Sequence, residues 1–152
     1  MENLSVSFRE MERRDIMDCF KVRTATHENR FSLEGLKKAG ITEESVAKML
    51  ATTCKGWVCE ADGQIVGFSM GNQSNGEFWA VAVLPAYEGR GIGKKLAESA
   101  QEWLWASGCA EIWLWTSSDT STRAYRLYKK IGWKDCGIQE GQRIMKLRRH
   151  EN

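Results

Sequence analysis

The chain has little of what metal-binding and disulfide-stabilised proteins require. It contains two histidines, and no two of its cysteines are spaced as a C-x-x-C pair, so the ligands of a histidine-built or zinc centre are missing. The five cysteines are odd in number, which argues against a disulfide framework and favours reduced, packed thiols. They are Cys19, Cys54, Cys59, Cys109 and Cys136. We therefore expect no metal ion.

Long apolar runs and a strong net charge are also missing. The longest apolar run, 78–87, is about half as long as a membrane-crossing helix. The first fifteen residues carry seven charges and no apolar stretch of the kind that secretory signals have. The net charge is only +2, whereas nucleic-acid binders are usually strongly basic. We expect a cytoplasmic protein that binds neither membrane nor nucleic acid; the basic residues of 123–130 and 146–149 keep a nucleic-acid surface open as an alternative.

What is present suits one compact domain spanning 1–152, because 42% of the residues are hydrophobic. Period-two patterns predict strands, period-3.6 patterns predict helices, and Asp62-Gly63 predicts a hairpin turn. No helix is expected in the polar segment 24–40. Strands are expected at 6–8, 57–60, 65–70, 77–84, 111–116, 133–138 and 143–147, and helices at 13–23, 42–53, 92–107 and 124–131. The pattern predicts an α/β or α+β fold with a mixed sheet of about seven strands and four helices, in which 77–84 and 111–116 are buried on both faces.

The most informative segment is the glycine-rich turn 88–94 between a predicted strand and a predicted helix. Glycines there allow several N–H groups to converge on one anion, and the start of the helix adds partial positive charge. Lys94 stands where both a dinucleotide fingerprint and a Walker A loop need glycine, so both are excluded. A tight strand–helix turn without a ligand remains the alternative on glycine content alone.

Glu88-Gly89-Arg90-Gly91-Ile92-Gly93 resembles the pyrophosphate loop of the GNAT family of N-acetyltransferases, whose pattern is Arg/Gln-x-x-Gly-x-Gly/Ala. Glu88 departs from that pattern, since the family has Arg or Gln there. A second segment, 124–133, reads AYRLYKKIGW and is similar to the family's A-x-x-L-Y-x-K-x-G-F. Ser121 stands where the family often has Asn. The two motifs together make the resemblance specific.

The resemblance implies a GNAT-like, largely antiparallel sheet whose two central parallel strands, 77–84 and 111–117, splay apart to hold acetyl-CoA. Backbone groups of 81–83 would pair with the pantetheine arm, and amides of 89–94 would hold the pyrophosphate. The implied coenzyme-binding residues are Val81, Ala82, Val83, Glu88, Gly89, Arg90, Gly91, Ile92, Gly93, Lys94, Ser121, Tyr125 and Tyr128.

The implied reaction is direct attack of an amine on the thioester within a ternary complex, without a metal. Tyr128 aligns with the tyrosine that protonates the leaving sulfur, and core packing is its alternative role. Tyr125, one turn earlier, is a second candidate. Glu77 aligns with the family's general base; ordered water as the base, with Glu77 a solvated turn residue, is the alternative. Cys109 or Cys136 as an acyl-accepting nucleophile is disfavoured because no histidine lies near either in the sequence.

Substrate recognition is less well defined. Glu28 and Asn29 lie in the segment that borders the acceptor site in this family, and Trp79, Trp113 and Trp115 are candidates for its walls. We expect an acetyl-CoA-dependent transfer to a primary amine of a small molecule or peptide; a peptide N-terminus, a lysine, a polyamine and an aminoglycoside all remain open. The family also suggests a homodimer. A non-catalytic module that binds acyl-CoA as a regulatory ligand is the alternative.

Overall fold

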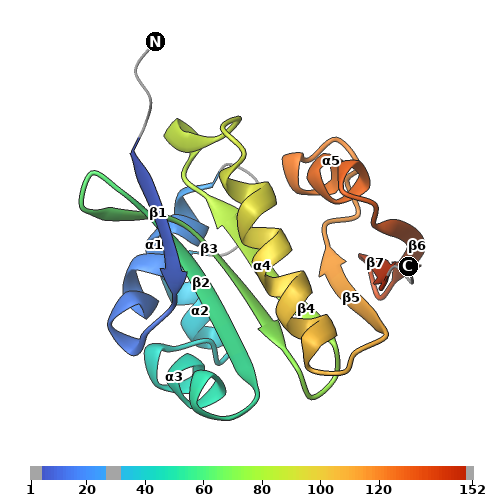
Figure 1. Cartoon of the computed structure of the whole chain (residues 1–152), viewed down its shortest axis with the longest axis horizontal. Coiled ribbons are helices and arrows are strands. Elements are labelled where there is room, and N and C mark those ends of the chain that lie inside the picture. The colour runs from blue at the N-terminus through green and yellow to red at the C-terminus, as the bar shows by residue number, and fades with distance from the viewer. Residues whose placement is uncertain (1–4, 27–31, 150–152) are drawn as a thin grey trace.

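The computed structural model describes residues 5–26 and 32–149 (Figure 1). Over these residues the strands are β1 (Val6–Glu10), β2 (Cys54–Ala61), β3 (Gln64–Asn72), β4 (Glu77–Val83), β5 (Glu111–Thr116), β6 (Lys134–Gln139) and β7 (Gln142–Arg148). The helices are α1 (Ile16–Ala25), α2 (Leu33–Lys38), α3 (Glu43–Thr52), α4 (Ile92–Ala106) and α5 (Arg123–Lys130), with 3₁₀ turns at Arg13–Asp15 and Pro85–Tyr87. The α/β class is confirmed.

The seven strands form one sheet in the order β1-β2-β3-β4-β5-β7-β6. Only β4 and β5 run parallel, and every other neighbouring pair is antiparallel. At the tip of the β2–β3 hairpin, Asp62 and Gly63 have φ values of 52° and 78°, as a turn with two left-handed residues requires. The predicted mixed, largely antiparallel sheet is therefore confirmed, together with its predicted hairpin turn.

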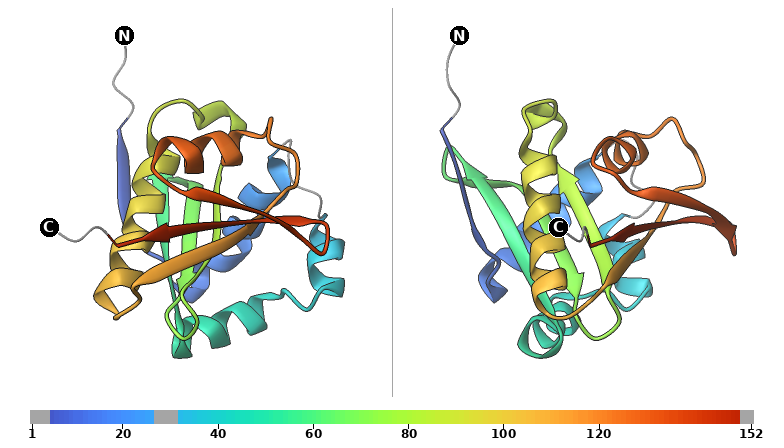
Figure 2. Two further views of the ribbon diagram at one scale, coloured as in Figure 1. Left: turned by 90° about the vertical axis from the view of Figure 1, so that its right-hand side faces the viewer. Right: turned by 45° about the vertical axis from the view of Figure 1, so that its right-hand side comes forward.

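The two faces of the sheet are covered by different helices (Figure 2). On one face α4 packs with Ile92, Leu96 and Ala100 directed into the core, as the apolar spacing of its sequence predicts. On the other face α1 and α3 contribute Ile16, Phe20 and Val46. Within the described parts of the chain, no helix combines the length and apolar character needed to cross a bilayer.

Two expectations need correction. Over the described residues there are five helices rather than four, because α2 forms inside the segment 24–40: Ser32 caps it, but only Leu36 is buried, and one buried residue leaves no periodic pattern to detect. The strands expected to be buried on both faces are largely half-buried. In β4 only Phe78 is buried, and in β5 only Ile112 and Leu114 are. In β4 side chains on both faces are only partly covered, as Val81 on the α4 side and Trp79 on the opposite side show.

Candidate active site

The line along which β4 faces β5, here called the β4–β5 seam, is open over most of its length. Six positions pair β4 with β3 and six pair β5 with β7, but β4 and β5 are in register only at Glu77 and Trp113. The Trp113 amide donates to the Gly76 carbonyl, with 3.1 Å between N and O. Beyond that point alternate N–H and C=O groups of β4 have no partner strand on this side. The predicted divergence of the two parallel strands is therefore present.

A β-bulge in β4 lies beside the last paired position of the seam. Gly71 of β3 pairs with Phe78 and Met70 pairs with Ala80, so Trp79 is an extra residue. The bulge changes which way the side chains point. Phe78 and Val81 pack on the α4 side, whereas Trp79 packs against the cluster beneath α1 and α3. The bulge therefore re-aims β4 at the place where it leaves β5.

The glycine turn follows β4 and leads directly into α4. Gly89 and Gly91 have φ values of 77° and 82°, and a Cβ at either position would meet open space. Gly91 is the N-cap of α4 and supplies no capping side chain, so the amides of 92–94 lack a side-chain cap. The Ile92 side chain is buried in the core, which leaves only its backbone N–H for binding. Uncapped amides at a helix start, beside open space, suit an anion such as a diphosphate.

Strand β4, helix α4 and helix α5 meet at the end of the seam. A Cβ on Gly93 would lie 3.4 Å from Cδ2 of Leu127 and 3.6 Å from Cγ2 of Val83. An ion pair joins the glycine turn to α5: the Arg123 Nε lies 2.5 Å from Oε2 of Glu88. Residues 81–83 and 88–94, which the family resemblance assigns to coenzyme binding, are therefore brought together beside α5.

Tyr128 lies on the face of α5 that packs into the core. Its ring makes edge-on contacts with Phe78 and a tilted contact with Trp133, with centroids 5.9 and 5.8 Å apart. Burial raises the pKa of its phenol, so the hydroxyl is protonated at neutral pH. Within the described residues no group hydrogen-bonds to this hydroxyl. The contact with Phe78 sets the ring against β4 at the bulge.

Glu77 stands at the first residue of β4, at the only paired position of the seam. Its backbone N–H is 2.9 Å from Oδ1 of Asn75, and the residue is half-buried. Burial raises the pKa of the Glu77 carboxyl, although a hydrogen bond with Asn75 acts in the opposite direction. A carboxylate with a raised pKa is a better proton acceptor than an exposed one.

Tyr125 and Ser121 have partners of their own. The Tyr125 hydroxyl lies 3.0 Å from Oδ2 of Asp135, and that carboxylate also accepts from Arg143. Accepting this hydrogen bond, Asp135 raises the pKa of the Tyr125 phenol. The Ser121 hydroxyl donates to Asp119 over 2.7 Å. Of the two tyrosines, only Tyr128 keeps its hydroxyl unengaged by the described residues.

The candidate acceptor residues are only partly described. Glu28 and Asn29, and the neighbouring His27, lie outside the described residues. The Arg23 guanidinium lies over the Trp79 ring, 5.8 Å from its centroid. Trp113 and Trp115 are in edge-on contact at 6.0 Å, and Trp113 Nε1 donates to the Asn75 carbonyl over 2.9 Å. All three tryptophans are half-buried.

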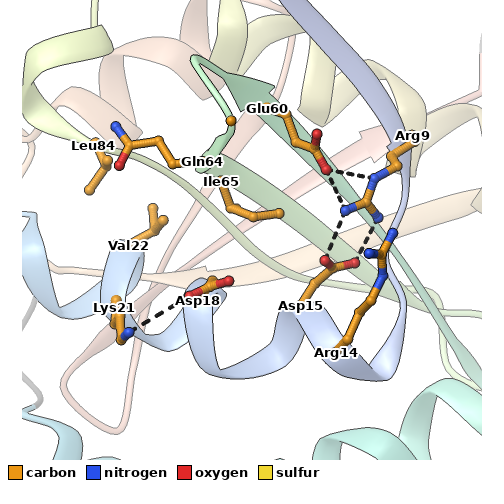
Figure 3. Close-up of a pocket in the computed structure, with 11 residues that line it drawn as sticks. Arg9, Arg14, Asp15, Asp18, Lys21, Val22, Glu60, Gln64, Ile65 and Leu84 are labelled. Carbon is orange, nitrogen blue, oxygen red and sulfur yellow. Dashed lines mark hydrogen bonds and ion pairs between the residues drawn. The ribbon is translucent and has the colours of Figure 1, made fainter.

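A cavity of about 500 Å³ lies away from the seam, between β1, α1 and the β2–β3 hairpin (Figure 3). Arg9 is its central charge and is held by both oxygens of Asp15, at 2.7 and 2.9 Å, and by Glu60. None of the predicted site residues lines this cavity. Because the Arg9 guanidinium is paired with two carboxylates, we assign this cluster of charges a structural role rather than a catalytic one. Over the described residues no group of three or more metal-ligating side chains is found.

Sequence reasoning missed the partners of the site residues. The contact between Arg123 and Glu88, and that between the Phe78 and Tyr128 rings, join segments far apart in the chain. The acidic residue at a position where the resembled family carries a basic or amide side chain was a usable signal for the first. For the second there was none, because apolar residues in a strand do not reveal what they contact.

The family model for the acetyltransferase (GNAT) family matches residues 16–133. A mycothiol acetyltransferase of Renibacterium salmoninarum is 34% identical over 77 residues, which are 45% of this chain and 22% of that protein, so the chain spans about a fifth of it. An acetyltransferase of Pectobacterium atrosepticum is 32% identical over 97 residues, covering 61% of this chain and 67% of that one. The solved PaiA N-acetyltransferase of Thermoplasma acidophilum with coenzyme A shares the fold, with a TM-score of 0.82, 19% identity and coverage of 96% and 100%.

Proposed function

The chain belongs to the acetyltransferase (GNAT) family, and on that premise we propose that it is an acetyl-CoA-dependent N-acetyltransferase that acetylates a primary amine. Family membership supports acetyl transfer. The direct attack of the amine within a ternary complex, the residues that carry it out and the acceptor are parts of the proposal.

The observation that carries the proposal is the open β4–β5 seam ending at an uncapped helix start. Over 81–83 the edge of β4 offers backbone groups to an extended ligand, as an exposed strand does to an added strand. At the end of the same strand, Gly89 and Gly91 adopt left-handed conformations and the amides of 92–94 lack a side-chain cap. An arm with amide groups followed by a diphosphate, as in coenzyme A, matches this sequence of binding groups.

Two side chains flank the seam where the chemistry would occur. The coenzyme supplies the acetyl group as a thioester. Glu77 accepts a proton from the incoming amine, helped by the pKa that burial raises. Tyr128 holds its proton at neutral pH, because a phenol is ordinarily protonated there and burial raises its pKa further. It donates that proton to the departing sulfur.

The acceptor would approach on the face of the sheet that carries Trp79 and Trp115. The half-buried rings of these residues offer apolar surface and a face for a cation. Glu28 and Asn29 are proposed to border the same site on sequence grounds alone. A homodimer remains a prediction from the family resemblance.

Titration calorimetry with acetyl-CoA, using ATP and NAD as controls, tests the proposal without an acceptor. We expect acetyl-CoA alone to bind. Gly91→Leu should weaken binding about tenfold or more, because a side chain at φ 82° is strained and the amides of the turn shift. Acetyl transfer to a panel of amines, followed by release of free thiol, then tests catalysis.

Gly40→Leu is the matched control. Gly40 also has a φ of 82° and open space around its Cβ, but it follows α2, far along the chain from the glycine turn. It should suffer the same backbone strain and bind acetyl-CoA as the wild type does. Equal loss of binding in both variants, or no binding of acetyl-CoA by the wild type, would contradict the proposed function.

A further inference from the structure

The Glu88–Arg123 ion pair joins the glycine turn to α5 at the end of the β4–β5 seam. Glu88 directly precedes the left-handed Gly89, and Arg123 is the first residue of α5. The Glu88 side chain is 21% exposed and that of Arg123 is 61% exposed. The carboxylate is therefore largely shielded from solvent, while much of the Arg123 side chain remains exposed.

The position of the carboxylate is electrostatically unfavourable for the proposed function. A diphosphate held by the amides of 89–94 would lie beside Glu88, and two anions at that distance repel each other. The resembled family carries a cationic or amide side chain at this position. Here the cation paired with Glu88 comes from α5, and Arg123 presents a planar guanidinium suited to phosphate oxygens.

We infer that Arg123 is a ligand of the coenzyme diphosphate and that Glu88 competes with the diphosphate for it. Without coenzyme, Glu88 holds Arg123 across the seam. When coenzyme binds, Arg123 exchanges the Glu88 carboxylate for the diphosphate. The Glu88 carboxylate then lies next to the negatively charged diphosphate without its cationic partner. Glu88 therefore weakens coenzyme binding and eases release of the product coenzyme. This inference rests on the proposed function.

The alternative is a purely structural pair that fixes the turn against α5, and the sign of one substitution separates the two. Under competition, Glu88→Gln tightens acetyl-CoA binding about threefold to tenfold, because it removes both the competitor and the repulsion. Arg123→Gln weakens binding by a similar factor. In the Arg123→Gln background, Glu88→Gln should have a smaller effect, since no guanidinium is left to release. Under a structural role, both single variants weaken binding.

The experiment is titration calorimetry of the four proteins with acetyl-CoA and with its 3′-dephospho form. Glu111→Gln is the matched control, because Glu111 pairs with the exposed Arg148 over 3.1 Å at the opposite end of β5; it should leave affinity unchanged. Thermal unfolding verifies that each variant is folded.

Each outcome of these titrations either supports or overturns the exchange of Arg123 between Glu88 and the diphosphate. Tighter binding by Glu88→Gln that persists with the 3′-dephospho form supports exchange at the diphosphate. Weaker or unchanged binding by Glu88→Gln overturns the inference while leaving the proposed function standing. An effect that disappears with the 3′-dephospho form overturns the assignment to the diphosphate, and an equal Glu88→Gln effect in both backgrounds overturns the exchange. Failure of the wild type to bind acetyl-CoA overturns the proposed function and this inference together.

Discussion

The corner formed by β1, β2 and α1 differs from the β4–β5 seam in how its polar groups are partnered. At the corner, Arg9 contacts Asp15 through two hydrogen bonds and Glu60 through two more. At the seam, β4 pairs with β5 at one position only, although it stays paired with β3 on its other side. Helix α4 begins there without a side-chain cap. The corner satisfies its charges internally, whereas the seam leaves backbone groups for something else to bind.

This difference indicates a structural role for the corner and a binding role for the seam. An unpartnered polar group is costly unless water or a ligand satisfies it, so a fold keeps such groups in place only with a rigid frame behind them. The frame at the seam is the buried cluster of Phe78, Tyr128 and Trp133 on one side and the six paired positions of β3 and β4 on the other. Substitutions at the seam should therefore affect turnover or binding, and substitutions at the corner should affect stability.

The largest expected effect is that of Tyr128→Phe. Removing the proton donor while keeping the ring and its contacts should lower kcat about 1,000-fold, with acetyl-CoA affinity changed less than about twofold. Steady-state kinetics and calorimetry measure the two quantities. The same variant separates an enzyme from a regulatory coenzyme-binding module, which would have no turnover to lose. A variant that keeps full kcat would remove Tyr128 from the mechanism.

Glu77→Gln should come next, with kcat/KM about 100-fold lower at neutral pH. The base must be deprotonated to act, so wild-type activity should rise as pH rises through the Glu77 pKa. That pKa is raised above its ordinary value by burial, which moves the acid limb of the profile upward. The variant should lack this limb. If its pH profile matches that of the wild type, an ordered water rather than Glu77 takes the proton.

At the corner, Asp15→Ala should lower the free energy of unfolding at pH 7 by about 1 to 2 kcal/mol, since it breaks a part-buried ion pair but leaves Arg9 paired with Glu60. Hydrogen bonds from Arg9 lower the Asp15 pKa. The contribution is thus complete above the ordinary carboxyl pKa and is lost as pH falls through the lowered one. Urea unfolding from pH 7 to pH 2 should show the gap between wild type and variant closing.

Acetyl-CoA affinity should stay unchanged in Asp15→Ala, since the corner lies away from the seam. Asp18→Ala is the control: its contact with Lys21 is long, at 3.8 Å, and exposed, so its loss should cost less than about 0.5 kcal/mol. A large loss of coenzyme affinity in Asp15→Ala would mean that the corner and the seam are not independent.

The sequence predicted the seam better than it predicted what surrounds it. Local patterns located β4, the turn at Gly89–Gly91 and α4. The apolar periodicity, the glycines and the signals for a helix start can all be recognised from residues adjacent in the sequence. The bulge at Trp79 was not predicted, since an extra residue in a strand shows only against its partner. The pairing of Glu88 with Arg123 depends on tertiary contact between residues 35 positions apart. The acidic residue at position 88 indicated an unusual contact there, but local patterns do not identify the residue that makes it.

The smallest effect is expected for Tyr125→Phe, which tests whether the two tyrosines of α5 really differ. Its hydroxyl donates to Asp135, but Arg143 also holds that carboxylate. Losing one partly exposed hydrogen bond should lower Tm by only about 1 to 2 °C and leave kcat within about twofold of the wild type. The raised Tyr125 pKa means that this stability is present at pH 7 and is lost as pH rises through that value, so the gap in Tm should close in strong base. A fall in kcat comparable to that of Tyr128→Phe would instead assign Tyr125 to proton transfer and place the reacting sulfur nearer to β6 than to β4.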